Sequence, residues 1–376
     1  MSIRFNRRQV MRGVIGGAIG MATAPTVVAQ WDPRRIDPNA QLGPKPGVVR
    51  LSSNENPYGP GPKALQAASD AVSKGAYYPF SIANNLQHAI ADRHGLTLDN
   101  LLLSSGSNEA LQAAFVAFGK KGKVVVPELT YSAPIGYASR LGVEIERVPL
   151  KADMSIDLDG MAAAVDDSVS MVYICTPNNP TGIIVDGDKL RKFCRDIGDS
   201  AIVLIDEAYN ELTDDPEYSS MIDLVRDEEN VLVMRTFSKI YGMAGLRIGY
   251  AMARPDLASE TRKHVMSWPS GVALAAAIAA YDDTDFVDYS REMILEGRAM
   301  VNETFRRNGV KALPSQGNFI FANIGQDADE FAAKLRAERV MIRGAYQPFT
   351  NYSRVSMGKI EDLKVFDEVF TRVYQG

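Results

Sequence analysis

The sequence predicts an α/β protein with a mostly parallel sheet, followed by a smaller α+β unit towards the C-terminal end. The chain has 376 residues, of which 46% are hydrophobic, and this is enough for two packed units. Short apolar runs alternate with amphipathic segments of helical length, such as residues 188–197. That alternation is typical of parallel strands joined by helices.

Five apolar runs read as buried strands of the predicted sheet. They are "KVVV" at 123–126, "SMVYIC" at 170–175, "AIVLI" at 201–205, "NVLVM" at 230–234 and "RIGYAMA" at 247–253. From about residue 284 the chain becomes helical and charged, and it then contains the strand-like "NFIFANI" and a final helix near 361–374. This tail predicts the smaller α+β unit.

The N-terminal segment has the layout of an export signal. The basic stretch "NRRQVMR" precedes an apolar, glycine-rich run over residues 13–29, which ends in "VVA". Basic, apolar and small segments in that order are typical of a secretory signal, and the Arg7-Arg8 pair resembles a twin-arginine signal. We expect a mature, periplasmic or otherwise exported protein that begins at Gln30. The alternatives are an N-terminal helix docked on a cytoplasmic protein, or a patch that binds nucleic acid.

Composition argues against several classes of function. The net charge of -5 gives no support to a nucleic-acid partner. The two cysteines, Cys175 and Cys194, and the three scattered histidines fit no zinc pattern, so we expect no metal. Both cysteines read as small buried hydrophobes, although a disulfide between them is an alternative. After the N-terminus there is no uncharged apolar run of about 18 residues, so no membrane-spanning helix is expected.

Polar residues follow several of the predicted strands, where ligands of open parallel sheets bind. In "LLLSSGSNEALQAAF" a strand-like run leads through Ser and Gly into a helix. Free N–H groups at the start of a helix, beside the positive end of its dipole, form an anion site, most often for phosphate. The alternative is an ordinary helix cap made by Ser107.

Two further strand ends carry an amide and a carboxylate. In "YICTPNNPTG" a buried strand leads into turn residues, and Asn179 there can donate to a ligand oxygen, or the segment is simply a turn. In "VLIDEAYNEL" Asp206 directly follows apolar residues, where a carboxylate is costly unless it is paired. Its partner is either a structural cation or a cationic nitrogen of a ligand.

A lysine completes the set. Lys239, in "RTFSKIYGMAGLRIGY", lies between two apolar strands, and a lysine in an apolar setting loses its charge and becomes a nucleophile for Schiff-base chemistry. The alternative is a solvated loop lysine. Arg247, eight residues later, is suited to a phosphate. Phosphate donors, a donor for a phenolic oxygen, a carboxylate for a ring nitrogen and a lysine for an aldehyde together match pyridoxal 5'-phosphate.

The ordered motifs also resemble a known family. "SNENPYG", "YYP", "SGSNEA", "TYSAP", "PNNPTG", "DEAY" and "TFSKIYGMAGLRIGY" are similar to those of the class I/II aminotransferases of the aspartate aminotransferase fold, and among them to the histidinol-phosphate aminotransferases. The motifs run from about residue 52 to 358 and so cover nearly all of the expected mature chain. The resemblance implies pyridoxal phosphate as cofactor and an amino group moved from an amino acid, or from an amine like histidinol phosphate, to a 2-oxo acid.

The resemblance also implies the roles of individual residues towards the cofactor. Lys239 binds its aldehyde as a Schiff base and later moves the proton between Cα and C4′, and Asp206 pairs with the ring nitrogen. Asn179 and Tyr209 hydrogen-bond the ring oxygen, and Tyr131 stacks on the ring. The phosphate is held by the group Ser107, Asn108, Ser238 and Arg247. Tyr78 in "YYP" reaches the phosphate of a neighbouring subunit, which implies a homodimer with shared sites.

Towards the substrate, the resemblance implies that Arg354 grips the α-carboxylate, for which a bidentate guanidinium is suited. Asn54 and Tyr58 line the entrance, and Arg343 faces the substrate phosphate. The sequence departs from the family around the substrate, where "GAYQPFTNYS" follows Arg343 and "HVMSWPSGVA" precedes a helix. The amino donor therefore stays open among histidine-like, aromatic and other compounds.

The predicted domains combine these observations. Residues 1–29 form the signal, 30–79 an N-terminal arm with part of the small domain, 80–265 the large cofactor-binding domain, and 266–376 the small C-terminal domain. Two alternatives to an aminotransferase remain, a decarboxylase or lyase on the same scaffold and a non-catalytic exported binding protein. The presence of Lys239, Asp206 and Arg354 argues against the second, because a binding protein has no need of all three.

Overall fold

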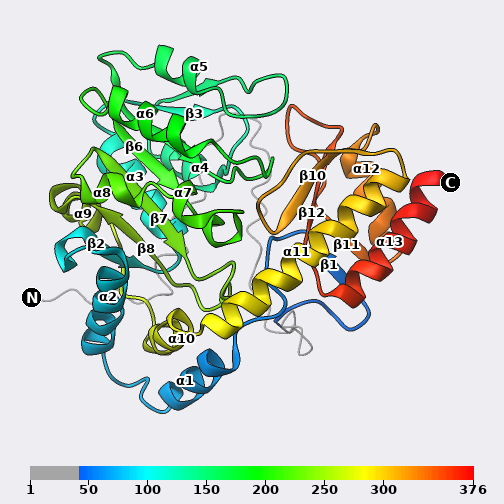
Figure 1. Cartoon of the computed structure of the whole chain (residues 1–376), viewed down its shortest axis with the longest axis horizontal. Coiled ribbons are helices and arrows are strands. Elements are labelled where there is room, and N and C mark those ends of the chain that lie inside the picture. The colour runs from blue at the N-terminus through cyan, green and yellow to red at the C-terminus, as the bar shows by residue number, and fades with distance from the viewer. Residues whose placement is uncertain (1–41) are drawn as a thin grey trace, which may run out of the picture. The chain divides into compact units, whose positions relative to one another are not determined.

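A seven-stranded sheet is the central feature of the computed structural model, which describes residues 42–376 (Figure 1). The strand order is β2-β8-β7-β6-β5-β3-β4. The strands are β2 (Leu101–Ser104), β3 (Lys123–Pro127), β4 (Ile145–Val148), β5 (Val169–Cys175), β6 (Ile202–Asp206), β7 (Val231–Thr236) and β8 (Gly249–Ala253). All neighbours run parallel except β8, which is antiparallel to β7 and to β2. The predicted mostly parallel sheet is confirmed, while the predicted signal over residues 1–29 lies outside the described residues.

The two faces of the sheet are both buried, which explains the continuous apolar runs of the strands. Along β5, Met171 and Tyr173 pack in the core beneath α3 (Ser107–Gly119). The alternate residues Val172 and Ile174 pack in the core on the opposite face, which also holds residues of α6 (Gly187–Ile197). The period of two along a strand thus sends successive side chains into two different cores.

Helices fill the connections between the strands. In addition to α3 and α6, this part of the chain contains α2 (Phe80–His94), α4 (Ala133–Arg140), α5 (Leu158–Ala163), α7 (Pro216–Ser219), α8 (Ile222–Arg226) and α9 (Pro255–Arg262), with 3₁₀ turns at Leu98–Asn100 and Asn210–Leu212. The predicted helix 188–197 is α6, and Asp186 caps it by accepting a 3.0 Å hydrogen bond from Lys189 N. The run predicted as a strand from residue 247 becomes one only at Gly249, because Arg247 has a left-handed φ of 59°.

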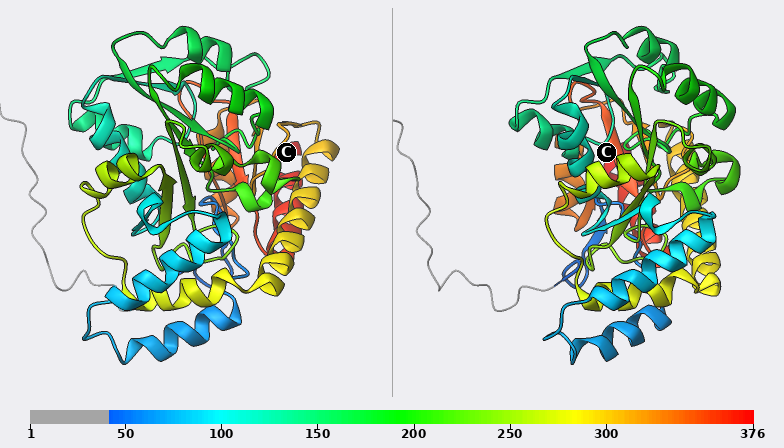
Figure 2. Two further views of the ribbon diagram at one scale, coloured as in Figure 1. Left: turned by 60° about the vertical axis from the view of Figure 1, so that its left-hand side comes forward. Right: turned by 90° about the vertical axis from the view of Figure 1, so that its left-hand side faces the viewer.

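A smaller α+β unit follows, as the sequence predicted. Its antiparallel sheet has the order β12-β10-β9, formed by β9 (Lys311–Ala312), β10 (Phe319–Asn323) and β12 (Tyr352–Ser356). A parallel pair joins β1 (Val49–Leu51) to β11 (Val340–Ile342). The helices α11 (Thr284–Arg307), α12 (Ala328–Ala337) and α13 (Ile360–Gln375) belong to this region, and both views of Figure 2 show α11 and α13 beside its strands.

Helix α10 (Gly271–Tyr281) connects the two regions along the chain. It packs against α1 (Pro62–Val72) and α2 at the lower end of Figure 1. The predicted boundaries at residues 79 and 265 place these three helices in three different domains, and those boundaries stay predictions. Among the described residues, no helix combines the length and the apolar character needed to cross a membrane.

Candidate active site

A cavity of about 310 Å³ lies beyond the carboxyl ends of β5, β6 and β7. Eleven of the fourteen predicted site residues line it: Asn54, Ser107, Asn108, Tyr131, Asn179, Asp206, Tyr209, Ser238, Lys239, Arg247 and Arg354. Most of them lie near strand ends of the large sheet or at the start of α3. Asn54 lies in the segment after β1, and Arg354 lies in β12. Parallel strands that end at one edge explain why residues so far apart in the chain meet here.

One end of the cavity is the N-terminus of α3. Gly106 precedes the helix with a φ of 84°, and a Cβ at this position would overlap the guanidinium group of Arg247. The helix has no side-chain cap, so Ser107 does not act as the cap. The first N–H groups of a helix have no intrahelical acceptor, and with the dipole they favour an anion.

Arg247 and Ser238 complete this anion site. Arg247 Nη1 donates to Ala244 O at 2.9 Å and to Ser238 Oγ at 3.4 Å, while Nη2 donates to Ser105 O at 3.4 Å. These bonds hold the guanidinium group beside the helix end. A cation, a hydroxyl group and helix N–H groups are the donor set that suits a phosphate dianion.

Asp206 is a buried carboxylate in the lining of the same cavity. Its Oδ1 accepts a 3.2 Å bond from Ala208 N, and its Oδ2 accepts a 3.1 Å bond from Tyr173 Oη. Burial raises the pKa of Asp206 to about 6, and the hydrogen bonds from Tyr173 and Ala208 act in the opposite direction. The carboxylate is thus ionised at neutral pH in a buried setting, where a cationic ring nitrogen is a suitable partner.

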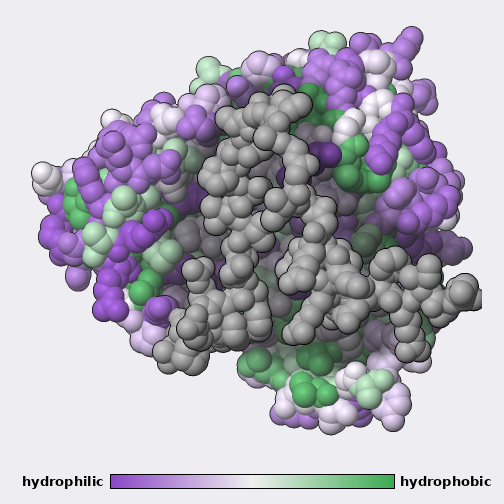
Figure 3. Space-filling view, turned by 180° about the vertical axis from the view of Figure 1, so that it is seen from behind, coloured by the Kyte–Doolittle hydropathy of each residue, from purple (hydrophilic) through white to green (hydrophobic). Residues whose placement is uncertain are grey.

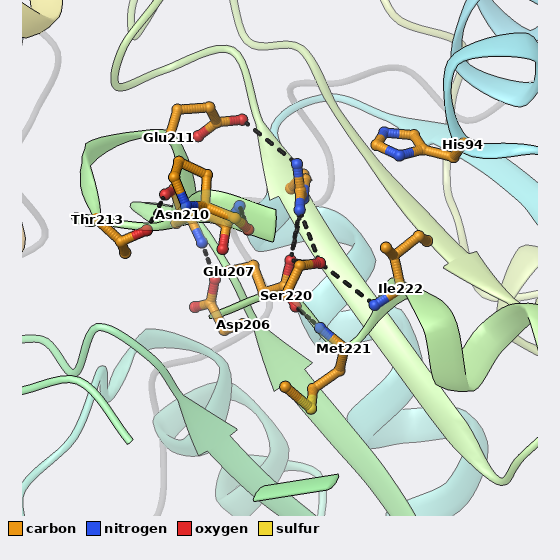
Figure 4. A network of polar contacts seen from close by, with 12 residues as sticks. His94, Asp206, Glu207, Asn210, Glu211, Thr213, Ser220, Met221 and Ile222 are labelled. Carbon is orange, nitrogen blue, oxygen red and sulfur yellow. Dashed lines mark hydrogen bonds and ion pairs between the residues drawn. The ribbon is translucent and has the colours of Figure 1, made fainter. Parts of the chain in front are cut away.

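The next residue, Glu207, points into the opposite core. It accepts hydrogen bonds from Ser220 Oγ at 2.8 Å and Met221 N at 2.6 Å, as Figure 4 shows. Arg235 of β7 donates to the same carboxylate from Nε at 3.0 Å and from Nη2 at 2.8 Å. This buried ion pair links β7 to the residue that follows β6. It thus connects the two segments that carry Asp206 and Lys239.

Lys239 also lines the cavity. Its Nζ donates to Asn54 O at 3.0 Å and lies 5.4 Å from the centre of the Tyr209 ring. Burial lowers the pKa of Lys239 to about 8, and the positive charge of Arg354 acts in the same direction. The lowered pKa makes the unprotonated amine, which a nucleophile requires, far more abundant near neutral pH than in a solvated lysine.

The side wall carries donors for an oxygen. Tyr209 Oη accepts from Asn54 Nδ2 at 3.0 Å and from Asn179 Nδ2 at 3.4 Å, so its own proton is available to donate into the cavity. Burial raises the pKa of Tyr209, which keeps this phenol protonated. Tyr131 donates to Asn108 Oδ1 at 3.3 Å, and burial raises the pKa of Tyr131 to about 12.

Arg354 closes the cavity from β12. Its Nη1 donates to Asn179 Oδ1 at 2.7 Å, and its Nη2 donates to Ser52 O at 2.9 Å. The buried Nε of Arg354 has no hydrogen-bond partner within the described part of the chain. An unused donor on a held guanidinium group is suited to a carboxylate ligand.

Three predicted residues lie outside this cavity. Arg343 lines a neighbouring cavity of about 840 Å³, which shares Tyr131, Asn179 and Arg354 with the first. Tyr58 accepts a 3.1 Å bond from Ile360 N through its hydroxyl oxygen. Tyr78 is 83% exposed. Their predicted roles stay predictions.

Several residues of the site carried no sequence signal. Ser356 Oγ donates to Asn54 Oδ1 at 2.7 Å, and Asn318 Nδ2 donates to Asn54 O at 3.1 Å. Both come from the smaller sheet region, and only the tertiary fold brings them to Asn54. In the sequence, Tyr173 is simply one of the residues of the apolar run that forms β5. Nothing there indicates that its hydroxyl group reaches Asp206.

This geometry agrees with the comparisons. The family model for aminotransferases of class I and II matches residues 46–369, so the chain belongs to that family of enzymes. Within it, the chain is similar to histidinol-phosphate aminotransferases. The Brevibacillus brevis enzyme is 35% identical over 86% of this chain and 91% of its own, and the Symbiobacterium thermophilum enzyme is 36% identical over 85% and 89%.

Solved structures agree with this assignment. A putative histidinol-phosphate aminotransferase from Erwinia carotovora atroseptica has a TM-score of 0.84 at 30% identity, with 87% of this chain and 96% of that chain covered. The histidinol-phosphate aminotransferase from Sinorhizobium meliloti, in complex with pyridoxal-5'-phosphate, has a TM-score of 0.80 at 27% identity over 87% and 91%. The predicted fold and enzyme class are confirmed, and the predicted cofactor agrees with the one held by that neighbour.

Proposed function

We propose that this chain is a pyridoxal-phosphate aminotransferase that takes an amino group from a histidinol-phosphate-like amine or an amino acid and gives it to a 2-oxo acid. The observation that carries the proposal is that Lys239 and Asp206 line one cavity together with an anion site, the start of α3 and Arg247. Bound pyridoxal phosphate supplies an electron sink for the carbon that exchanges its amino group.

The residues present fit this cofactor at each end. Asp206 would hold the ring nitrogen, while Asn179 and Tyr209 would donate to the ring oxygen and Tyr131 would cover the ring face. The phosphate would be held by the group Ser107, Asn108, Ser238 and Arg247. A non-catalytic binding protein is disfavoured, because the low pKa of Lys239, caused by burial, serves a nucleophile and is of no use to a passive ligand site.

The chain's own residues would carry out the proton transfers and the positioning. Lys239 has a pKa of about 8, which suits a group that both accepts and donates a proton near neutral pH. It would take the proton from the substrate carbon and donate it again later in the reaction. Arg354, whose buried Nε has no partner within the described residues, would bind the α-carboxylate of an amino acid or 2-oxo acid and orient that substrate. For an amino-acid substrate, retention of the carboxylate on Arg354 favours transamination over decarboxylation on the same scaffold.

The neighbouring cavity of about 840 Å³ indicates the class of substrate. Arg147 and Arg343 line it, and neither takes part in an ion pair within residues 42–376. The ring centre of Tyr346 lies 5.5 Å from the guanidinium carbon of Arg343 and 5.9 Å from that of Arg354. An amine with a flat side chain and a phosphate fits such a cavity.

A panel of amino donors tests the function. We expect kcat/KM for histidinol phosphate to exceed that for histidinol by at least about tenfold, and the preference to fall in Arg343→Gln and Arg147→Gln. Arg140→Gln, a change of an exposed arginine outside both cavities, serves as the matched control. Equal rates for both donors would refute the phosphate specificity. Carbon dioxide release from an amino-acid donor of the panel, without consumption of the 2-oxo acid, would show a decarboxylase instead.

A homodimer with shared sites is a further part of the proposal. Tyr77, Tyr78 and Phe80 are 78%, 83% and 53% exposed, and Trp268, edge-on to Phe80 at 5.6 Å, is 51% exposed. Figure 3 shows more hydrophobic surface at the lower edge, in the region of α1. Exposed aromatic clusters of this kind mark interaction sites, and a second copy of the chain is the partner we propose.

Complementation tests the sharing of sites. Tyr78→Ala and Lys239→Ala chains, each weakly active alone, should regain activity when refolded together, because one site of the mixed dimer combines Lys239 of one chain with Tyr78 of the other. A lack of recovery in confirmed mixed dimers would show that Tyr78 serves no partner site. Light scattering gives the oligomeric state directly.

Export by the twin-arginine route is the remaining proposal. The Arg7-Arg8 pair, the glycine-rich apolar run and the "VVA" ending support it. This route carries folded proteins, so the cofactor would be loaded before export. N-terminal analysis of protein from the native cell should find Gln30 first, and an intact Met1 would contradict export with cleavage.

A further inference from the structure

Tyr173 makes an unusual contact for a core residue. Its side chain is fully buried in the core beneath α3, and its ring meets Phe115 edge-on at 5.4 Å. From this fixed position its hydroxyl donates a 3.1 Å hydrogen bond to Asp206 Oδ2. The side chain enters from β5, next to β6, and approaches the carboxylate from within the protein instead of from the cavity.

The groups around Asp206 provide little positive charge, so the hydrogen bond from Tyr173 matters for the charge of this carboxylate. The groups that face the carboxylate are Tyr173 and Cys175 of β5, Tyr131, Tyr209 and Lys239, together with the backbone N–H of Ala208. Among these side chains only Lys239 carries a positive charge, and it must lose that charge in order to react. Neutral hydrogen-bond donors in fixed positions are therefore the groups that stabilise the negative charge of Asp206 whether or not Lys239 is protonated.

We propose that Tyr173 is a positioning residue, which keeps Asp206 ionised and fixes its orientation towards the ring nitrogen of the bound cofactor. The inference rests on the proposed function. A hydrogen bond to the charged form of a carboxylate favours that form, and a donor locked by packing does so without reorganisation. Tyr173 thus acts through Asp206 and touches neither cofactor nor substrate.

Cofactor affinity gives the first test. Tyr173→Phe keeps the ring and removes only the hydroxyl group, so the fold should be retained. We expect the Kd of pyridoxal phosphate, measured by titration of the cofactor-free protein, to rise about tenfold, as for the loss of one hydrogen bond to a charged group. The matched control is Tyr250→Phe, which removes the hydroxyl of another buried tyrosine of the same sheet, in the core on the opposite face.

A double-mutant cycle separates positioning from general packing. In Asp206→Asn protein, the further change Tyr173→Phe should leave the cofactor Kd unchanged, because the charge that Tyr173 supports is already absent. Equal effects of Tyr173→Phe in both backgrounds would overturn the proposal, as would an effect of Tyr250→Phe as large as that of Tyr173→Phe.

Titration of Asp206 itself gives a second test that needs no cofactor. Burial raises the pKa of Asp206 to about 6, and the Tyr173 hydroxyl lowers it, so Tyr173→Phe should move the midpoint upward by about one unit. Infrared spectra of cofactor-free protein with ¹³C-labelled aspartate, with Asp206→Asn as the blank, follow this carboxyl group. An unchanged midpoint would overturn the proposal. A failure of unaltered protein to bind the cofactor would instead contradict the proposed function, and the titration would still test Tyr173.

Discussion

The side-chain nitrogen of Lys239 lies 3.0 Å from the backbone carbonyl oxygen of Asn54, although 185 residues separate the two. Lys239 follows β7 of the large sheet, while Asn54 follows β1, which pairs with β11. Asn318 and Ser356, from the smaller sheet region, hold Asn54 in turn. The proposed nucleophile is thus positioned by both parts of the fold.

The backbone of Asn54 leads to a first prediction, on stability. Asn54 has a φ of 51°, which glycine adopts freely and which costs alanine roughly 1 kcal/mol. Asn54→Ala and Asn54→Gly both remove the amide, so we expect the alanine variant to be less stable by about that amount in urea unfolding. At Asn308, where φ is -96°, the alanine variant should be at least as stable as the glycine variant. The opposite order at Asn54 would contradict the role of its left-handed backbone.

The charge of Lys239 leads to a second prediction. Burial lowers the pKa of Lys239 to about 8, Arg354 lowers it further and Asp206 raises it. Acylation of Lys239 in cofactor-free protein, followed by mass spectrometry across a pH series, should therefore have a midpoint near pH 8. Arg354→Gln removes a cation and should raise this midpoint, whereas Asp206→Asn removes an anion and should lower it. Arg254→Gln, at a surface ion pair with Asp256, should leave it unchanged. Shifts of the same sign in the first two variants would contradict this account.

Much of this site could be predicted from the sequence, because its residues follow strand ends. Asn179, Asp206 and Lys239 come after β5, β6 and β7, and parallel strands bring such residues to one edge. The parallel order thus converts a linear pattern into a cavity. Arg354 could be placed only by the family resemblance, since nothing around it in the sequence distinguishes it from a surface arginine.

The remaining contacts depend on tertiary structure. Ser356 and Asn318 reach Asn54 across 302 and 264 residues, and no local pattern encodes such a pairing. The antiparallel direction of β8 was also not predicted, because an apolar run by itself carries no information on its direction. Within the described chain, the connection from β7 to β8 contains no helix, as an antiparallel pair allows. The start of β8 at Gly249 instead of Arg247 was not predicted either. It follows from the left-handed backbone of Arg247, a conformation that arginine seldom adopts.

The buried pair of Glu207 and Arg235 leads to a third prediction. Their side chains are 0% and 9% exposed, and Glu207 also accepts from Met221 N. Arg235→Met leaves a buried carboxylate without its cation and should lower the free energy of unfolding by about 3–5 kcal/mol. The double variant Glu207→Gln with Arg235→Met keeps an acceptor for Met221 N without the charge, and we expect it to be more stable than Arg235→Met alone.

Chemical denaturation of the four proteins in this cycle measures the coupling of the pair. Arg254→Met, at an exposed ion pair, is the control and should change the free energy of unfolding by less than about 1 kcal/mol. A double variant less stable than Arg235→Met would show that the hydrogen bonds of Glu207, and not its charge, dominate at this place.

Gly106 leads to the last prediction, which separates backbone strain from ligand binding. Gly106 and Gly142 share a φ of 84°, which L residues rarely adopt, so alanine at either position should lower stability, by roughly 1–3 kcal/mol. A Cβ at Gly142 has no atom within 4 Å, whereas a Cβ at Gly106 overlaps the guanidinium group of Arg247 and displaces it from the helix end. Gly106→Ala should therefore raise the Kd of pyridoxal phosphate at least about tenfold, and Gly142→Ala should leave it unchanged although it is destabilised too. Equal affinities in the two variants would mean that Arg247 contributes little to binding the phosphate. A loss of affinity in Gly106→Ala alone would assign it to the displaced arginine, since Gly142→Ala introduces backbone strain without an overlap.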